Sequence, residues 1–382
     1  MTRDLAHYPL SELVIERPKS TVKVRDSSEI GPVAFYTSGI KIARHTESLC
    51  SGENIYIATG GKANFQYLDG PAAYSTDTYV ITGTNRIETK YLYYFLTSQT
   101  EFIDENLFRG AALRHLSRPE FKALQVPLPS LLEQQRIVHL LDEAFEVITI
   151  AKANAENNLQ NARELFESQL QAIVGQDGEG WAMAKLEEIV EADCSLSYGI
   201  VQPGEGTSTG LPIVRPTDLT SKVIQLDGLK RIDPQLAEGY KRTTLRGGEL
   251  LLCVRGSTGG VGISSAELSG GNVTRGIVPI RIRNSVVLPD LGYFLMKSDH
   301  VQRQIREKTY GTALSQINIR DLRKITIRIP PFDTQPTLLA NLNSLETQCA
   351  HLSEFFNTKS KKIGDLGNAL LNHFFSENHI AA

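Results

Sequence analysis

The stretch "LPSLLEQQRIVHLLDEAF" (residues 128–145) decides how this chain is organised. A proline-terminated apolar segment opens directly into an amphipathic pattern, in which apolar residues recur every three or four positions, as on one face of a helix. Much later, "IPPFDTQPTLLANLNSLE" (329–346) repeats this pattern in a less complete form. The sequence therefore predicts two long helices, each at the end of a globular segment.

The two helices belong to a larger internal repeat. The segment "GAALRHLSRPEFKALQVPLP" (110–129) aligns without a gap on "GTALSQINIRDLRKITIRIP" (311–330), at a constant offset of 201 residues that continues through both helices. Three further pairs are "YPLSELV" (8–14) with "AKLEEIV" (184–190), "IYIATGGKANF" (55–65) with "LLCVRGSTGGVGI" (251–263), and "YYFLTS" (93–98) with "GYFLMKS" (292–298). Such self-similarity indicates one unit, a globular domain followed by a long helix, written twice.

Both helices carry an apolar seam with heptad spacing. Steps of four and three from residue 137 to 172, and from 338 to 373, give nine apolar positions of eleven in each helix. Small residues in the first seam correspond to large ones in the second, as two packed helices require. The sequence predicts an antiparallel coiled coil packed through Ile137, Leu141, Ile148, Leu165, Leu338, Leu342, Leu345, Leu352, Phe356 and Leu366.

The globular segments contain short β-branched runs separated by glycine and proline, such as "LPIVRP" and "IVPIRIR". Together with the helices, these runs predict an α+β fold class, with two α+β domains separated and joined by the two long helices. The predicted segments are a first domain (1–129), a first helical spacer (130–178), a second domain (179–330) and a second helical spacer (331–382).

Charge is segregated along the chain. The first domain has 14 basic and 14 acidic side chains, and the second globular stretch, residues 181–330, has 20 and 15. Residues 130–180 carry 3 basic and 9 acidic side chains. Excess lysine and arginine can follow a polyanion, whereas an acidic helix is repelled by one. On charge alone, the better explanation is that the acidic helix and the basic second globular stretch are both merely solvated surfaces.

Several classes of protein are not indicated. No apolar run approaches the roughly 20 residues that span a bilayer, and the start "MTRDLAHYPL" lacks the apolar core of a signal peptide, so we expect a cytoplasmic protein without membrane contact. The four cysteines lie far apart without a CxxC pair, which predicts buried thiols and neither a disulfide framework nor a metal site. The segment "RGSTGGVGIS" (255–264) lacks the ending of a phosphate-binding loop, and its glycines, hydroxyls and Arg255 suit an approach to DNA better.

Catalytic motifs are also missing. The segment "IPPF" (329–332) is the nearest match to the catalytic loop of adenine methyltransferases, but Ile329 cannot hold the amino group of a base. Pro330 aligns with Pro129 of the repeat, which favours a simple stop before a helix. The sequence therefore indicates no catalytic residues.

The repeated arrangement, with "LPSLLEQQRIVHLLDEAF" and "IPPFDTQPTLLANL" at the two helix starts, closely resembles the DNA-specificity subunit of Type I restriction-modification systems. The resemblance covers essentially the whole chain, and its most specific motif is Leu-x-x-Gln-Gln-Arg-Ile-Val in the first helix. The second copy departs from this motif, because Pro336 and Thr337 stand where the first copy has Gln135 and Arg136.

The resemblance implies a non-catalytic reader of DNA. Two target recognition domains would each grip one half of a bipartite, asymmetric target in double-stranded DNA, and two methyltransferase subunits would dock around the helical spacer. S-adenosylmethionine for adenine methylation would be held by those partners, and added restriction/translocase subunits would use ATP and Mg²⁺ to translocate and cleave. The chain itself would need no cofactor and no metal.

Polar residues in turn-rich segments are the candidate DNA contacts, because loops on a rigid scaffold present side chains to a ligand. In the first domain these candidates are Tyr36, Lys41, Lys62, Arg109 and Arg114. In the second domain they are Tyr198, Arg215, Arg255, Ser257, Thr258, Arg275, Thr312 and Ser315.

Two other functions stay open at this point. A self-contained DNA methyltransferase would bind S-adenosylmethionine as an isolated chain. A coiled-coil assembly scaffold would never touch DNA, which agrees with the balanced charge of the first domain. A mobility shift of the chain with its methyltransferase, at stated salt, separates the three functions.

Overall fold

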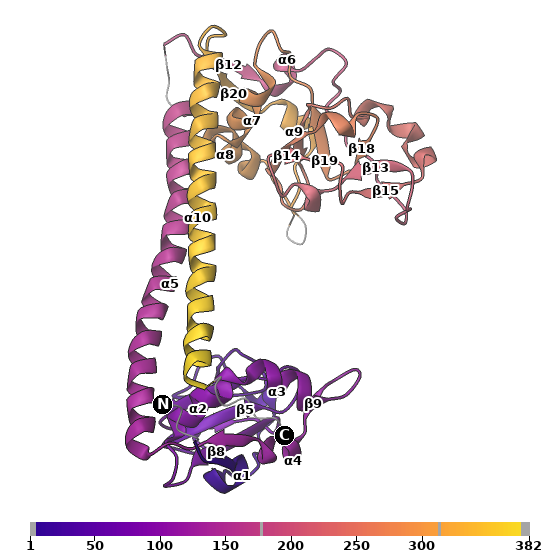
Figure 1. Cartoon of the computed structure of the whole chain (residues 1–382). Helices are drawn as coiled ribbons and strands as arrows, with labels where there is room; N and C mark the ends of the chain where they lie inside the picture. Colours follow the sequence, from indigo (N-terminus) through magenta and orange to yellow (C-terminus); the bar gives the residue numbers. More distant parts are fainter. Residues whose placement is uncertain (1–4, 176–178, 312–314, 376–382) are drawn as a thin grey trace. The chain divides into compact units, whose positions relative to one another are not determined.

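The computed structural model describes residues 5–175, 179–311 and 315–375. The chain divides into two compact units, one formed by Met1–Asn157 with Phe356–Ala382 and the other by Asn158–Phe355. Each unit combines one globular domain with segments of both long helices (Figure 1).

The first domain is built around a four-stranded antiparallel sheet in the order β2-β8-β5-β6, with a second sheet in the order β4-β3-β7. Strand β1 pairs with β11, which brings the start of the domain next to the segment that precedes the first long helix. The strands are β1 (His7–Pro9), β2 (Val14–Glu16), β3 (Val33–Tyr36), β4 (Ala43–His45), β5 (Glu53–Ala58), β6 (Phe65–Asp69), β7 (Ala72–Tyr74), β8 (Thr78–Gly83), β9 (Phe108–Arg109), β10 (His115–Leu116) and β11 (Gln125–Pro127). The helices are α1 (Leu10–Leu13), α2 (Thr89–Ser98), α3 (Thr100–Asn106) and α4 (Arg118–Ala123), with a short 3₁₀ turn η1 (Val24–Asp26).

The second domain repeats this plan. Its main sheet has the order β14-β17-β16-β19, its second sheet the order β15-β13-β18, and β12 pairs with β20 as β1 pairs with β11. The strands are β12 (Ala182–Lys185), β13 (Leu211–Val214), β14 (Val223–Ile224), β15 (Lys230–Ile232), β16 (Leu250–Cys253), β17 (Val261–Ser264), β18 (Asn272–Val273), β19 (Ile277–Ile280) and β20 (Thr326–Ile329). The helices are α6 (Leu186–Ile189), α7 (Pro289–Lys297), α8 (Asp299–Glu307) and α9 (Ile319–Arg323), with 3₁₀ turns η2 (Pro216–Asp218), η3 (Pro234–Thr243) and η4 (Ala266–Leu268).

The internal repeat that the sequence predicts is confirmed by this topology. Each domain has a parallel pair of strands in its second sheet, β3 with β7 and β13 with β18. An isolated bridge joins Gly60 to His115 in the first domain and Arg255 to Gln316 in the second. His115 and Gln316 are 201 residues apart, so the offset read from the sequence brings equivalent residues to equivalent places.

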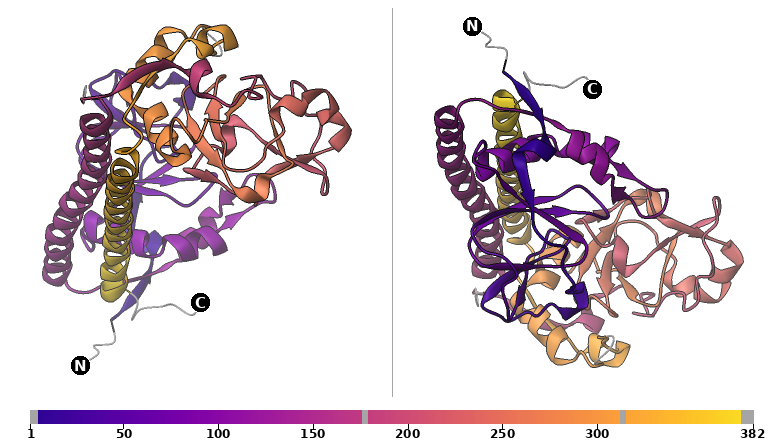
Figure 2. Two further views of the ribbon diagram at one scale, coloured as in Figure 1. Left: turned by 90° about the horizontal axis from the view of Figure 1, so that it is seen from above. Right: turned by 90° about the horizontal axis from the view of Figure 1, so that it is seen from below.

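The long helices are α5 (Leu131–Val174, 44 residues) and α10 (Gln335–Phe375, 41 residues). In the first unit, a Cβ atom added at Gly367 near the end of α10 would lie 3.2 Å from Phe145 near the start of α5, so the helices pack antiparallel. In the second unit, Leu170 and Leu342 of the two helices share the core of the domain. The helices lie side by side in all views (Figures 1 and 2), and the predicted α+β fold with an antiparallel helix pair is confirmed.

The seam between the helices differs in part from the predicted one. Leu165, Leu352 and Leu366 are 47%, 41% and 52% exposed, so their assignment to the helix contact was wrong. The buried or half-buried positions there are one residue further on, such as Phe166 and Gly367. An α-helix turns once per 3.6 residues, so a fixed 3.5-residue repeat drifts off the contact along a long helix. Ile137, Leu141 and Leu342 are buried as predicted, and Ile148, Leu338, Leu345 and Phe356 are half-buried.

None of the helices in the described ranges is long and apolar enough to cross a membrane. All four cysteines are free thiols; Cys194, Cys253 and Cys349 are buried and Cys50 is half-buried. Within the same ranges, no three His, Cys, Asp or Glu side chains gather as metal ligands would.

Candidate nucleic-acid interface

A glycine-rich loop follows β16 in the second domain. Hydrogen bonds to a segment later in the chain fix its position. Gly256 N–H donates to the Ser315 carbonyl at 2.8 Å, and the Thr258 hydroxyl donates to the same carbonyl at 3.1 Å. Gly256 and Gly259 have φ values of 87° and 96°, which side chains with a Cβ atom rarely adopt. The loop therefore has a defined shape, and glycine occupies the two positions at which this shape requires a positive φ.

Two tyrosines and two arginines gather beside this loop, and we name them the Tyr198 cluster: Tyr198, Arg255, Arg275 and Tyr310. The Tyr198 hydroxyl donates to the Ile317 carbonyl at 3.2 Å, which fixes the ring next to the segment that bridges the loop. Isolated bridges join both Arg255 and Tyr310 to Gln316, next to the residue that Tyr198 contacts. Burial raises the pKa of Tyr198, Tyr310 raises it further, and Arg275 and Arg255 oppose the rise. Tyr198 and Tyr310 are nevertheless 41% and 50% exposed and can offer their rings to a ligand.

The guanidinium groups of this cluster are not neutralised. Within the described residues, neither Arg255 nor Arg275 has a carboxylate within ion-pair distance. Arg215, which the sequence also selected, differs from them, because its guanidinium lies 2.8 Å and 3.1 Å from the Asp218 carboxylate. Arg215 therefore stabilises the turn after β13, whereas the charges of Arg255 and Arg275 are not used in this way within the described residues.

Most second-domain candidates come together in one place. Ser257 is exposed in the loop, Thr258 is bonded across it, and Ser315 is exposed on the facing segment. Thr312 lies outside the described residues. The sequence analysis missed Tyr310, although the signal was present: Tyr310 is the repeat equivalent of Arg109, a selected residue, at the offset of 201.

On the equivalent surface of the first domain, one carboxylate connects two neighbouring segments of the chain. Gly61 N–H donates to the Arg114 carbonyl at 2.9 Å, which joins the loop after β5 to the segment before α4. Asp104 accepts from Ala63 N–H at 2.6 Å and pairs with the Arg114 guanidinium, which also donates to the Asp104 carbonyl at 2.9 Å. Arg114 therefore joins α3 to the loop after β5, and Lys62 of that loop remains exposed.

The other first-domain candidates lie apart from each other. Arg109 is exposed but pairs with Glu120 at 3.2 Å, and Lys41 is exposed in the connection between β3 and β4. Tyr36 is only 3% exposed and stacks on Tyr56 with ring centroids 3.8 Å apart. The expectation that Tyr36 offers its side chain to DNA is corrected by this burial: strand β3 turns the ring into the core.

Asp104 leads to a prediction about pH. Burial alone would raise its pKa, but the hydrogen bonds from Ala63 and Arg114 outweigh burial and lower the pKa. Stability from this carboxylate is therefore present above its unfolded-state pKa and is lost as the pH falls below about 4. We expect Asp104→Asn to lower the urea midpoint of unfolding at pH 7, and we expect this difference to disappear at an acid pH below the lowered pKa of Asp104. Asp69→Asn, at an exposed position, is the control; an equal loss at both pH values would contradict the role of the charge.

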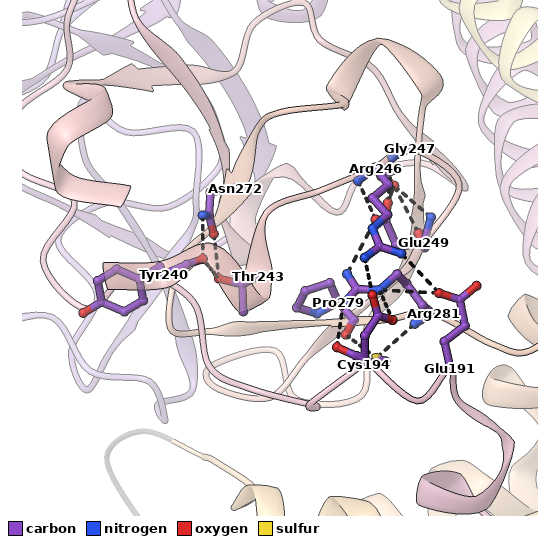
Figure 3. Close-up of polar contacts among 12 residues, drawn as sticks. Glu191, Cys194, Tyr240, Thr243, Arg246, Gly247, Glu249, Asn272, Pro279 and Arg281 are labelled. Carbon is purple, nitrogen blue, oxygen red and sulfur yellow. Dashed lines mark hydrogen bonds and ion pairs between the residues drawn. The ribbon is translucent and has the colours of Figure 1, made fainter. Parts of the chain in front are cut away.

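A separate polar network stabilises the second domain (Figure 3). Arg281 is 8% exposed, and carboxylate oxygens of Glu191, Asp193 and Glu249 each lie 3.9 Å from its guanidinium. Glu249 is itself buried and accepts from the Ser264 hydroxyl at 2.7 Å. Glu249 and Arg281 are buried beside the ends of β16 and β19, so the network connects these strands inside the domain and is not part of the candidate interface. Within the described residues, Arg281 Nε has ion-pair neighbours but no hydrogen-bond partner.

The structure is thus a duplicated one, with two α+β domains on one plan, loop surfaces of different chemistry and a shared antiparallel helix pair. Residues 20–161 and 178–355 match the family model described as "Type I restriction modification DNA specificity domain", and the chain belongs to this family.

Among curated relatives, the chain is similar to the Type I restriction enzyme EcoBI specificity subunit of Escherichia coli, with 21% identity over 309 residues, 75% of this chain and 65% of that protein. It is also similar to the MjaVIII specificity subunit of Methanocaldococcus jannaschii, with 20% identity over 329 residues, 82% of this chain and 72% of that protein. The chain thus spans just under two thirds of the length of the EcoBI subunit.

Solved structures show the same fold. A chain from a study of complex assembly and conformational transition of the type I R-M system superposes with a TM-score of 0.72 at 19% identity, covering 97% of this chain and 98% of that one. The HsdS subunit from Thermoanaerobacter tengcongensis has a TM-score of 0.54 at 17% identity, with 98% and 97% covered.

Proposed function

We propose that this chain is the non-catalytic, sequence-specific DNA-binding subunit of a Type I restriction-modification complex. The observation that carries the proposal is the Tyr198 cluster, in which two guanidinium groups with no ion-pair partner in the described part of the chain lie beside two exposed tyrosines and a glycine-rich loop. Guanidinium groups pair with phosphates or with the two acceptors of guanine, and the glycines of the loop allow its backbone to approach a ligand closely.

The two domains would read different half-sites. The second domain offers Arg255 and Arg275, whereas the equivalent bridge of the first domain joins Gly60 to His115, and Arg114 beside it is paired with Asp104. A surface of hydroxyls, amides and paired charges makes contacts that differ from those of free guanidinium groups. The target is therefore bipartite and asymmetric.

Partner subunits would supply the chemistry. Leu140, Val147 and Ile150 of α5 are 38%, 65% and 54% exposed, and their spacing of seven and three residues places them on one face. This face is suited to the apolar contacts of two methyltransferase subunits, which would hold S-adenosylmethionine. Restriction/translocase subunits with ATP and Mg²⁺ would join them in the cytoplasm, where the complex meets its DNA.

A mobility shift tests the proposal. The chain assembled with its methyltransferase subunits is titrated on genomic target DNA and on a shuffled duplex at 0.15 M salt. Preference for the target at least ~1000-fold supports a reader. Equal binding of both duplexes, or no binding, favours an assembly scaffold, and S-adenosylmethionine binding to the isolated chain favours a self-contained methyltransferase.

Modularity leads to a further prediction. Replacing residues 181–328 with the corresponding domain of a relative is expected to change one half of the methylated target and to leave the other half unchanged. The reason is that this segment contains the whole Tyr198 cluster and none of the first domain. Sequencing of methylated genomic sites measures both halves at once, and a change in both halves would contradict independent reading.

A further inference from the structure

Two fully buried glutamines make the same set of hydrogen bonds at the starts of the two long helices. The side-chain oxygen of Gln134 accepts from Glu88 N–H at 2.8 Å, and its amide nitrogen donates to the carbonyls of Arg86 at 3.2 Å and Pro129 at 2.9 Å. Both Gln134 and its repeat equivalent Gln335 have 0% of their surface exposed. We name these two sets of bonds the glutamine clamps.

The second clamp copies the first. The oxygen of Gln335 accepts from Leu288 N–H at 2.9 Å, and its amide nitrogen donates to the carbonyls of Val286 at 2.9 Å and Pro330 at 3.1 Å. The residues around Gln335 have changed, since Pro336 and Thr337 replace Gln135 and Arg136, but the geometry of the clamp has not. The same arrangement in two diverged copies indicates a requirement shared by both domains.

Each clamp ties a long helix to the turn that leads into a domain helix. Glu88 and Leu288 directly precede α2 and α7, and neither residue caps its helix with its own side chain. Helix α2 packs on strands β5 and β6, so the clamped turn is rigidly connected to the main sheet. The side-chain amide of each glutamine is planar and is hydrogen-bonded through both its oxygen and its nitrogen. It therefore fixes the direction as well as the distance between the long helix and the turn.

A second attachment follows two turns along each helix. In the first domain, Lys90 Nζ lies 2.7 Å from the carboxylate of Asp142. In the second, Lys222 Nζ lies 3.2 Å from the side-chain oxygen of Asn343, the repeat equivalent of Asp142, and 2.6 Å from Glu346. Eight residues separate clamp and lysine contact, which is about 12 Å along a helix. Because the glutamine clamp and the lysine contact attach the domain at two separate places, they together fix the angle between the domain and its helix.

We propose that Gln134 and Gln335 are positioning residues that set the orientation of each domain on its helix, and thereby the number of base pairs allowed between the two half-sites. The inference rests on the proposed function. A small change in orientation has a large effect. If the domain rotates on its helix by about 10°, a point about 20 Å from the pivot moves by roughly 3.5 Å, close to the rise of one base pair.

The test uses the complete complex with its methyltransferase subunits and a library of duplexes in which the interval between fixed half-sites varies base pair by base pair. Methylation of each member is read by sequencing. For Gln134→Ala and Gln335→Ala we expect the preference for the natural interval over its neighbours to fall about tenfold, with the half-site bases unchanged. Gln135→Ala is the matched control, because Gln135 is the exposed neighbour that bonds only the side chain of Glu88, at 2.7 Å.

The remaining outcomes distinguish the inference from a purely structural role. Gln134→Met and Gln335→Met keep the volume and remove the hydrogen bonds, and they should relax the interval as the alanine variants do. A lower melting temperature with an unchanged interval preference would overturn the inference, as would failure of both substitutions at a clamp to fold. If the unaltered complex methylates no bipartite site, the proposed function fails instead.

Discussion

Arg255→Ala is expected to weaken binding of the assembled complex to its target by about 5- to 150-fold, which corresponds to ~1–3 kcal/mol for a lost guanidinium contact. Arg255 lies in the glycine-rich loop, has no ion-pair partner among the described residues and shares the Tyr198 cluster with Arg275. Its removal takes a positive charge and five donors from the surface without breaking a bond inside the domain. Assembly with the methyltransferase subunits should be unchanged.

The pattern of the loss identifies what Arg255 contacts. If Arg255 reads guanine, the variant should relax specificity at one position of one half-site. If Arg255 holds a phosphate, all sequences should weaken alike and the salt dependence of binding should fall by about one ion.

Fluorescence anisotropy with singly substituted duplexes at several salt concentrations measures both patterns. Arg303→Ala is the matched control, because Arg303 is an exposed arginine of the same domain that lines a cavity with Gln171 and Arg328 and does not belong to the Tyr198 cluster. Equal losses for the two variants would remove the loop from the interface and leave only a general effect of charge.

Lengthening both helices by one heptad is expected to add about three base pairs to the interval between half-sites. Phe145 of α5 faces Gly367 of α10. Counting twelve residues forward along α5 leads to Asn157, and counting twelve residues back along α10 leads to Phe355. Insertions after these two residues stand at matched levels of an antiparallel pair and fall at the boundary between the two compact units, so neither core is altered. Seven residues add ~10.5 Å of helix, and a base pair rises about 3.4 Å.

The double insertion keeps the seam in register, because a heptad returns each side chain to nearly the same face. Inserting seven residues in α5 alone gives the control, since its partner cannot follow and the shared contacts are lost; this variant should fold poorly. Methylome sequencing of cells carrying the double insertion reads the new interval. An active complex that retains its original interval would show that the helices do not measure the distance.

Much of the fold could be predicted because it is written twice. The repeat located the equivalent strands, the paired loops and the two helices without any knowledge of their contacts, and its offset is constant at 201 residues from residue 110 through the first helix. The exact seam could not be read, because the drift of a 3.6-residue turn against a heptad accumulates, and Leu165 and Phe166 are both apolar. Only packing decides which of two adjacent apolar residues faces the partner.

The candidate site was accessible to sequence reasoning where polar residues lie in glycine-rich loops. Arg255 and Ser257 belong to such a loop and are found on the surface there. Tyr36 was misjudged because a tyrosine at a strand end can face either way, and its stacking on Tyr56 depends on strand pairing. The glutamine clamps left no signal in composition, since a buried glutamine and an exposed one read alike; Gln134 and Gln135 differ only in which way the helix turns them.

The core of the first domain includes residues from the far end of the chain. Phe375 is fully buried, and its ring lies 5.5 Å and 5.8 Å from the rings of Tyr91 and Phe95, measured between centroids. During synthesis, the ribosome completes this domain's own strands long before α10 emerges, at about 5–20 residues per second. For about 12 to 50 seconds the nascent domain must therefore keep an apolar face open to water. The second domain, with α5 already made, closes its core first, so the half of the protein that is translated first is the half that finishes folding last.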